Sequence, residues 1–275
     1  IVDCDWSSDV CSSDLFYRPN TVTDLNQGGV GGIAAVIKAF ANQAGLDYTV
    51  SIETISGAAL DRHLRDKKEL LSRPWEHVVM AGYSTLDQNN PGNPALLVRT
   101  AKEMAELLAA QNPKVDIRLI ATWPRADQTY PDAGFWHGQP IEAMALAVRA
   151  GYDQAAAGTP LIHGVIPVGE AWLRAMKAGI ADPNPYDGIA FNQIDLWTHD
   201  HYHASNYGYY LESLMIFGDL TGLDPRSLGR NERVAIDLGF SAAQITALQQ
   251  VAADELTATK GRAPLQTFTP VPLPR

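Results

Sequence analysis

This sequence contains almost no cysteine. It also lacks a long apolar segment and an excess of basic side chains. The only cysteines are Cys4 and Cys11, within the first fifteen residues of a 275-residue chain. No apolar run reaches the roughly 18 residues that a membrane span needs. The formal net charge of −10 repels nucleic acid rather than attracting it. We therefore expect a soluble globular protein with no membrane span and no nucleic-acid partner.

The composition is that of one large α/β domain. Hydrophobic residues make up 46% of the chain, enough for a packed core. We expect the folded domain to comprise residues 16–260, followed by a proline-rich tail at 261–275. The sequence does not indicate the oligomeric state.

The first fifteen residues do not fit this domain. The stretch DWSSDVCSSDL (5–15) resembles a translated sequencing adapter, and it has neither helical nor strand periodicity. We interpret 1–15 as a non-native segment and set it aside. Its two cysteines then say nothing about redox compartment. A native leader peptide would be lost with the native N-terminus, so whether the soluble protein is exported stays open.

Beyond residue 15, apolar strands alternate with amphipathic helices. This order predicts βαβ units and a mainly parallel sheet of about five strands in a three-layer α/β/α sandwich. The expected strands are 47–56, 77–82, 117–123 and 161–168. The expected helices are 33–45, 58–71, 95–110, 141–156, 169–178, 205–220, 232–238 and 241–256.

The segment DLWTHDHYHASNYGYYL (195–211) is the richest in chemistry. Asp200 and His203 are three residues apart, directly before a predicted helix. A carboxylate at this spacing can bond one imidazole nitrogen and leave the other for substrate, as a general base requires. Loops at the carboxyl ends of parallel strands line ligand crevices. We predict that Asp200 and His203 form a catalytic acid–base pair.

This segment, together with NPYDG (184–188) and the tail of helices, resembles the last block of the SGNH (GDSL-type) hydrolases, in a bacterial branch. The resemblance covers residues 16 to about 256. It implies a flavodoxin-like fold and a serine esterase that acts on small-molecule carboxylic esters without a cofactor or metal. It also implies a serine in a Gly-Asp-Ser or Gly-Asn-Ser motif just after the first strand.

The family's other blocks are only partly present. Gly57 matches the block whose amide helps form the oxyanion hole. Gly82 and Ser84 lie where the family has Gly-x-Asn-Asp, with Ser84 in place of the oxyanion-donating Asn. Neither Gly-Asp-Ser nor Gly-Asn-Ser occurs in the chain. The resemblance therefore implies a first strand that is lost or replaced, and little or no esterase activity. Ser12 and Ser13 fall near the missing motif by accident.

Two rival interpretations remain open. His199, His201 and His203 alternate, so on a strand they would share a face and could bind zinc, with Asp127 as a further ligand. The chain would then be a metal-dependent hydrolase. Alternatively, it is a non-catalytic carbohydrate-binding module with aromatic platforms drawn from Trp123, Trp136, Trp172 and Trp197.

Arg125 and Asp127 follow a buried strand within TWPRADQTY (122–130). This position predicts a substrate-orienting arginine held by Asp127, or an ordinary loop salt bridge.

Overall fold

The computed structural model describes residues 2–3, 23–24, 32–55, 57–259 and 263–271. These residues form two compact units. The first unit comprises the described residues within 1–12, 23–28 and 51–169, and the second those within 29–50 and 170–275. Each unit is described separately below.

The first unit is built on a six-stranded sheet with the order β2-β3-β1-β4-β5-β6. Every neighbouring pair of strands is parallel. The strands are β1 (Val2–Asp3), β2 (Thr23–Asp24), β3 (Ser51–Glu53), β4 (His77–Met80), β5 (Asp116–Ala121) and β6 (Ile162–Pro167). Because β4, β5 and β6 have mostly buried residues at successive positions, both of their faces are covered.

The central strand β1 comes from the segment that we set aside as foreign. Val2 is in register with Ile52 of β3 on one side and with Val79 of β4 on the other. A strand therefore occupies the position at which we expected loss or replacement. The interpretation of 1–15 as non-native gains no support from the fold. The remaining residues of that segment, including Ser12 and Ser13, lie outside the described residues.

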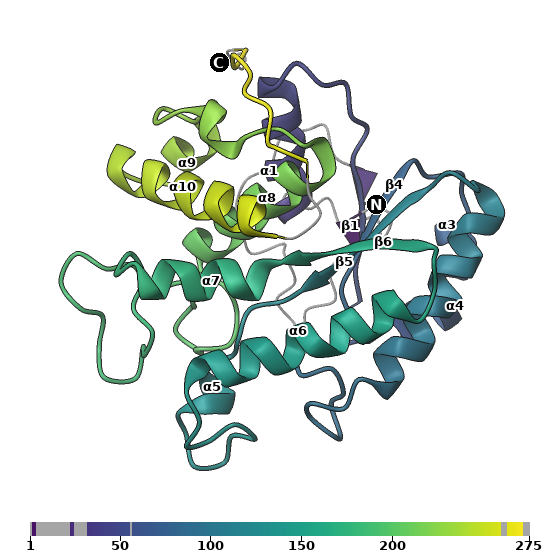
Figure 1. The fold of residues 1–275 in the computed structure, drawn as a ribbon, viewed down its shortest axis with the longest axis horizontal. Helices are drawn as coiled ribbons and strands as arrows, with labels where there is room; N and C mark the ends of the chain where they lie inside the picture. The colour runs from purple at the N-terminus through teal and green to yellow at the C-terminus, as the bar shows by residue number, and fades with distance from the viewer. Residues whose placement is uncertain (1, 4–22, 25–31, 56, 260–262, 272–275) are drawn as a thin grey trace. The chain divides into compact units, whose positions relative to one another are not determined.

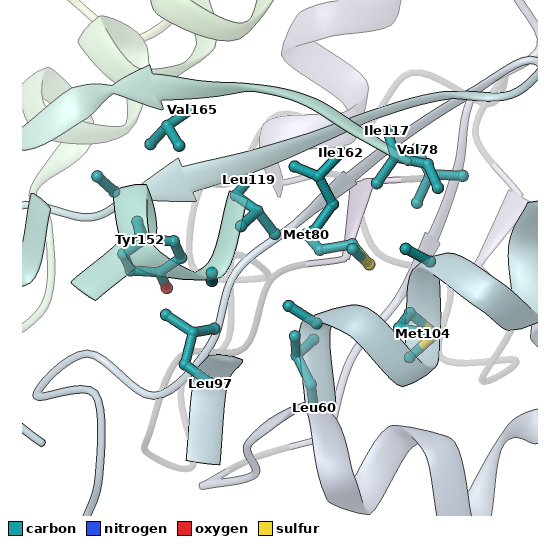
Figure 2. Close-up of a cluster of buried hydrophobic side chains, with 14 of the residues drawn as sticks. Leu60, Val78, Met80, Leu97, Met104, Ile117, Leu119, Tyr152, Ile162 and Val165 are labelled. Carbon is teal, nitrogen blue, oxygen red and sulfur yellow. The ribbon is translucent and has the colours of Figure 1, made fainter. Parts of the chain in front are cut away.

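Helices α2 to α6 complete the first unit. Their bounds are α2 (Leu60–Asp66), α3 (Lys68–Leu71), α4 (Ala95–Gln111), α5 (Ala126–Thr129) and α6 (Ile141–Ala157). The long helices α4 and α6 pack side by side (Figure 1). Figure 2 shows the core that results, with strand residues such as Met80 and Leu119 near Leu97 of α4 and Tyr152 of α6. This core fixes the strand ends from which the candidate site residues extend.

The second unit is helical. Its elements are α1 (Gly32–Gln43), α8 (Asn206–Thr221), the 3-10 helix η2 (Pro225–Leu228), α9 (Arg233–Asp237) and α10 (Ala242–Ala258), and α7 (Val168–Lys177) leads into it from the sheet. Helix α8 packs against both α1 and α10. Phe40 of α1 meets Tyr210 and Phe217 of α8 edge to face, with ring centroids 5.6 and 5.8 Å apart. This packing explains why α8 is buried around most of its circumference.

The predicted fold class, an α/β fold with a parallel sheet flanked by helices, is confirmed. The predicted elements appear in order, most within two residues of their expected ends. Two differ: the strand expected at 47–56 is only β3, and the helix expected at 58–71 is interrupted at Lys67, which has non-helical dihedral angles. Among the described residues, no helix is long and apolar enough to cross a bilayer. The domain boundaries stay a prediction.

Candidate active site

The Asp200–His203 pair lies in a closed turn directly before α8. Trp197 and Ala204 form an antiparallel bridge, and the Thr198 amide donates to the His203 carbonyl at 2.8 Å. Ser205 then caps α8 by accepting from the Gly208 amide. The turn is thus tied at both ends, so its side chains are held in place by backbone geometry.

Asp200 uses its two carboxylate oxygens for different purposes. Oδ2 pairs with Nδ1 of His203. Oδ1 accepts from the Thr198 hydroxyl at 2.7 Å and from the amides of Tyr202 and His203, both at 2.9 Å. Because Oδ1 is fixed by three donors, the carboxylate cannot rotate away from the imidazole.

The charge state of Asp200 follows from these contacts. Partial burial by itself would raise the pKa of Asp200. The hydrogen bonds from Thr198, from the His203 ring and from the two amides outweigh it and hold that pKa well below its ordinary value. Asp200 is therefore an anion at neutral pH. An anion at Nδ1 selects the tautomer of His203 that carries its proton there, which leaves Nε2 as the basic nitrogen.

The surroundings of the pair restrict its access to solvent. His203 is only 6% exposed, and its ring lies 4.1 Å from that of Tyr202, between centroids. At one end of the turn, Trp197 meets Trp172 edge to face with ring centroids 5.2 Å apart, and both side chains are buried. The His203 side chain is thus largely shielded from solvent.

The three histidines of the metal interpretation do not share a face. Residues 199–203 form turns and bends rather than a strand, so the alternation that the interpretation requires is absent. His201 has a positive φ of 56° and its ring contacts that of Tyr186, whereas His199 is exposed. In the part of the chain that the structure describes, no three His, Cys, Asp or Glu side chains gather as a metal-binding set.

The four tryptophans proposed as binding platforms are core residues. The exposed fractions of Trp123, Trp136, Trp172 and Trp197 are 1, 3, 0 and 2%. A ring so deeply buried cannot stack on a ligand. The carbohydrate-binding interpretation was wrong on this point, because an aromatic side chain in sequence does not reveal whether it faces the core.

In the first unit, the structure brings Ser84, Arg125 and Asp127 together at the carboxyl ends of β4 and β5. Arg125 Nε and Nη2 donate to the two carboxylate oxygens of Asp127 at 3.0 and 2.6 Å. Its Nη1 donates to Ser84 Oγ at 3.2 Å. Arg125 and Ser84 are 8% and 2% exposed. Arg125 is therefore a buried cation that Asp127 neutralises and that orients the Ser84 hydroxyl.

Gly57 and Gly82 are the two glycines that we predicted to lie near an oxyanion, and their backbone environments differ. The Gly82 amide donates to the Tyr152 hydroxyl at 2.7 Å inside the core, so it is already engaged. The Gly82 amide is therefore not available as an oxyanion donor in this structure. Gly57 lies in a turn with φ of 65°. The role of Gly57 as an oxyanion donor stays a prediction.

Gly82 nonetheless packs closely against the core. A Cβ atom there would lie 2.7 Å from Cδ1 of Leu97 and 3.5 Å from the Tyr152 hydroxyl, two residues of the core in Figure 2. The contact between Gly82 and Tyr152 joins residues 70 positions apart. Sequence spacing offered no signal for it.

Sequence reasoning also missed a second acid–histidine pair. Glu53 Oε2 pairs with His63 Nδ1, and both side chains are fully buried. The pair joins β3 to α2 on either side of the turn that contains Gly57. The sequence did contain a signal for this pair: a Glu in an apolar strand is followed by a His on the apolar face of the next helix.

Comparisons with known proteins agree with the fold. No family model and no curated protein matches the chain. A DUF4886 family protein from Bacteroides uniformis is 15% identical over 86% of this chain and 94% of its own, with a TM-score of 0.55. A carbohydrate esterase family 3 protein from Talaromyces cellulolyticus is 13% identical over 80% and 96%, with a TM-score of 0.47. A peptidoglycan O-acetylesterase is 15% identical over 62% and 46%, with a TM-score of 0.36. The first similarity shows a shared fold over nearly the whole of both chains.

Proposed function

We propose that this protein has the acid–base machinery of a serine-type ester hydrolase, in which His203 is the general base and Asp200 orients it. The observation that carries the proposal is the Asp200 carboxylate, which is bonded to Nδ1 of His203 and fixed by three further donors. This arrangement leaves Nε2 of His203 to exchange a proton with substrate. The resemblance of this block to that of the SGNH hydrolases supports the same roles.

The proposed reaction proceeds through an acyl-enzyme. Nε2 of His203 takes the proton of a serine hydroxyl as the oxygen attacks the ester carbonyl, and then delivers that proton to the departing alcohol. A water molecule attacks the acyl-enzyme in the same way, which releases the acid and restores the serine. Asp200 remains ionised throughout and stabilises the imidazolium.

We assign the stabilisation of the oxyanion to two hydrogen-bond donors, Gly57 and Ser84. The Gly57 amide is a backbone donor, and the Ser84 hydroxyl is oriented by Arg125. One such donor is typically worth about a hundredfold or more in rate. Arg125 and Asp127 then act on substrate indirectly, through the position of Ser84.

The chain as given lacks the serine motif of the resembled family, so we propose that its own esterase activity is very low. Residues 4–22, in which the motif would fall, lie outside the described residues. The family has the motif immediately after the first strand, which here is β1 (Val2–Asp3). Cys4, Asp5 and Trp6 follow that strand directly.

This placement allows a direct test. Cys4→Gly combined with Trp6→Ser creates Gly-Asp-Ser immediately after β1. With p-nitrophenyl acetate, we expect the unaltered chain to show a rate close to buffer, and the doubly substituted chain to show turnover that His203→Ala abolishes. Turnover that survives His203→Ala would exclude His203 as the base. Turnover by the unaltered chain that is lost in His203→Ala would support the base but overturn the expected inactivity.

A further inference from the structure

A small cavity opens beside the Gly57 turn in the first unit. Its volume is about 210 Å³, and it is bounded by the turn after β3, the start of α2 and the loop after β4. Pockets for drug-sized ligands measure roughly 300–1,000 Å³, so this one admits a smaller group. Gly57 forms part of the wall, and among the described residues other than its chain neighbours no atom lies within 4 Å of where its Cβ would be.

The positive and negative charges of the side chains in the cavity wall are equal in number. Asp61 and Asp87 contribute two carboxylates, and Arg62 and Arg65 contribute two guanidinium groups. Both arginines are also close to Asp66, with Arg65 Nε at 2.8 Å and Arg62 Nε at 3.6 Å from its carboxylate. Because these cations already have anionic neighbours, the cavity does not favour an anionic ligand such as a phosphate.

Several polar groups of the wall are available to a ligand. Among the described residues, the side chains of Asp61, Gln88 and Asn89 make no hydrogen bond to protein. A carboxylate only accepts hydrogen bonds, whereas each amide both donates and accepts. Hydroxyl groups, which also donate and accept, match this set. Tyr83 adds an aromatic side chain with a polar tip to the same wall.

We propose that this cavity binds a neutral polyhydroxylated group about the size of one sugar ring, as the alcohol part of the ester substrate. The assignment to the alcohol part rests on the proposed function, because Gly57 borders the cavity and is the proposed oxyanion donor. The binding itself depends only on the wall. An apolar ring would leave the polar groups of the wall unpaired.

Binding is measured with the full chain by saturation-transfer difference NMR. Methyl β-D-glucopyranoside is the neutral probe, cyclohexanol is an apolar ring of similar size, and glucose 6-phosphate is the charged comparison. Asn89→Ala and Asp61→Ala remove groups of the wall. Asn90→Ala is the matched control, because Asn90 is the next residue of the same exposed loop and does not line the cavity.

We expect the glucoside to bind more tightly than cyclohexanol or glucose 6-phosphate. Asn89→Ala and Asp61→Ala should each weaken its binding about three- to tenfold, as expected for one lost hydrogen bond, while Asn90→Ala changes it less than twofold. Equal affinity in all variants, or tighter binding of either comparison ligand, would overturn the proposal. Binding by this cavity without any His203-dependent esterase activity would uphold the sugar site and reject only its place in the reaction.

Discussion

Glu53 and His63 form an ion pair or hydrogen-bonded pair inside the core, with both side chains fully buried. Glu53 is the last residue of β3 and His63 lies in α2, so the pair spans the turn that carries Gly57 and one wall of the proposed sugar cavity. A buried pair of this kind fixes the two elements only while both partners are present. We therefore regard it as a positioning pair for that turn.

The pair leads to a prediction about stability. His63→Ala leaves the Glu53 carboxyl buried without its partner and also opens space in the core, so the free energy of unfolding should fall by about 3–5 kcal/mol. His137→Ala is the matched control, since His137 is 46% exposed at the side chain and should cost less than about 0.5 kcal/mol. Urea unfolding followed by circular dichroism compares the two. Similar losses in both variants would show that the buried pair contributes little.

A second prediction concerns Arg125 and Asp127. Asp127→Ala removes the carboxylate that neutralises Arg125, whose side chain is only 10% exposed, so the free energy of unfolding should fall by about 2–3 kcal/mol. Asp153→Ala breaks an ion pair with Arg149 on the surface of α6 and should cost less than about 0.5 kcal/mol. Both residues belong to the first unit, so the same unfolding experiment serves. Equal losses of unfolding free energy in Asp127→Ala and Asp153→Ala would mean that solvent stabilises the Arg125 charge without Asp127.

The sequence predicted what is local and missed much of what is long-range. Asp200 and His203 lie three residues apart, so one turn determines their geometry, and the spacing predicted the contact that the structure shows. The long helices were found because their apolar periodicity is continuous. The strand expected at 47–56 was predicted too long, because only Ser51–Glu53 of that segment pair as a strand in the structure.

The sequence did not predict the contacts between residues that are far apart along the chain. Ser84 and Arg125 are 41 positions apart, and each was proposed for the site without any reason to expect a bond between them. The family pattern placed Gly82 near the oxyanion, but the Tyr152 hydroxyl occupies its amide. Tertiary packing decides which amides are engaged, and no spacing in the sequence encodes it.

The bond between Gly82 and Tyr152 is itself testable. Tyr152→Phe keeps the ring in the core but leaves the Gly82 amide buried without an acceptor, which should lower the free energy of unfolding by about 1–3 kcal/mol. Tyr186→Phe is the control, because Tyr186 is 45% exposed. If the amide of Gly82 were exchanged rapidly with solvent in the unaltered protein, as seen by hydrogen exchange, the bond to Tyr152 would not hold in solution.

The ionisation of Asp200 gives a prediction about pH. Its pKa is depressed in the folded protein, so its hydrogen bonds stabilise the fold above the ordinary carboxyl pKa of about 3.9, and this contribution is lost as the pH falls towards the folded value. At pH 7, Asp200→Asn should therefore lower the free energy of unfolding by about 1–3 kcal/mol, the usual range for hydrogen bonds to a charged group. The difference between the two proteins should shrink only as the pH drops below about 4. Carboxyl ¹³C NMR provides the direct measurement: the Asp200 resonance should keep its ionised shift through the range in which free aspartate protonates. A resonance that titrates at the ordinary value would mean that the donors around Asp200 do not favour its anion, and the carboxylate would then be a weak partner for the His203 imidazolium.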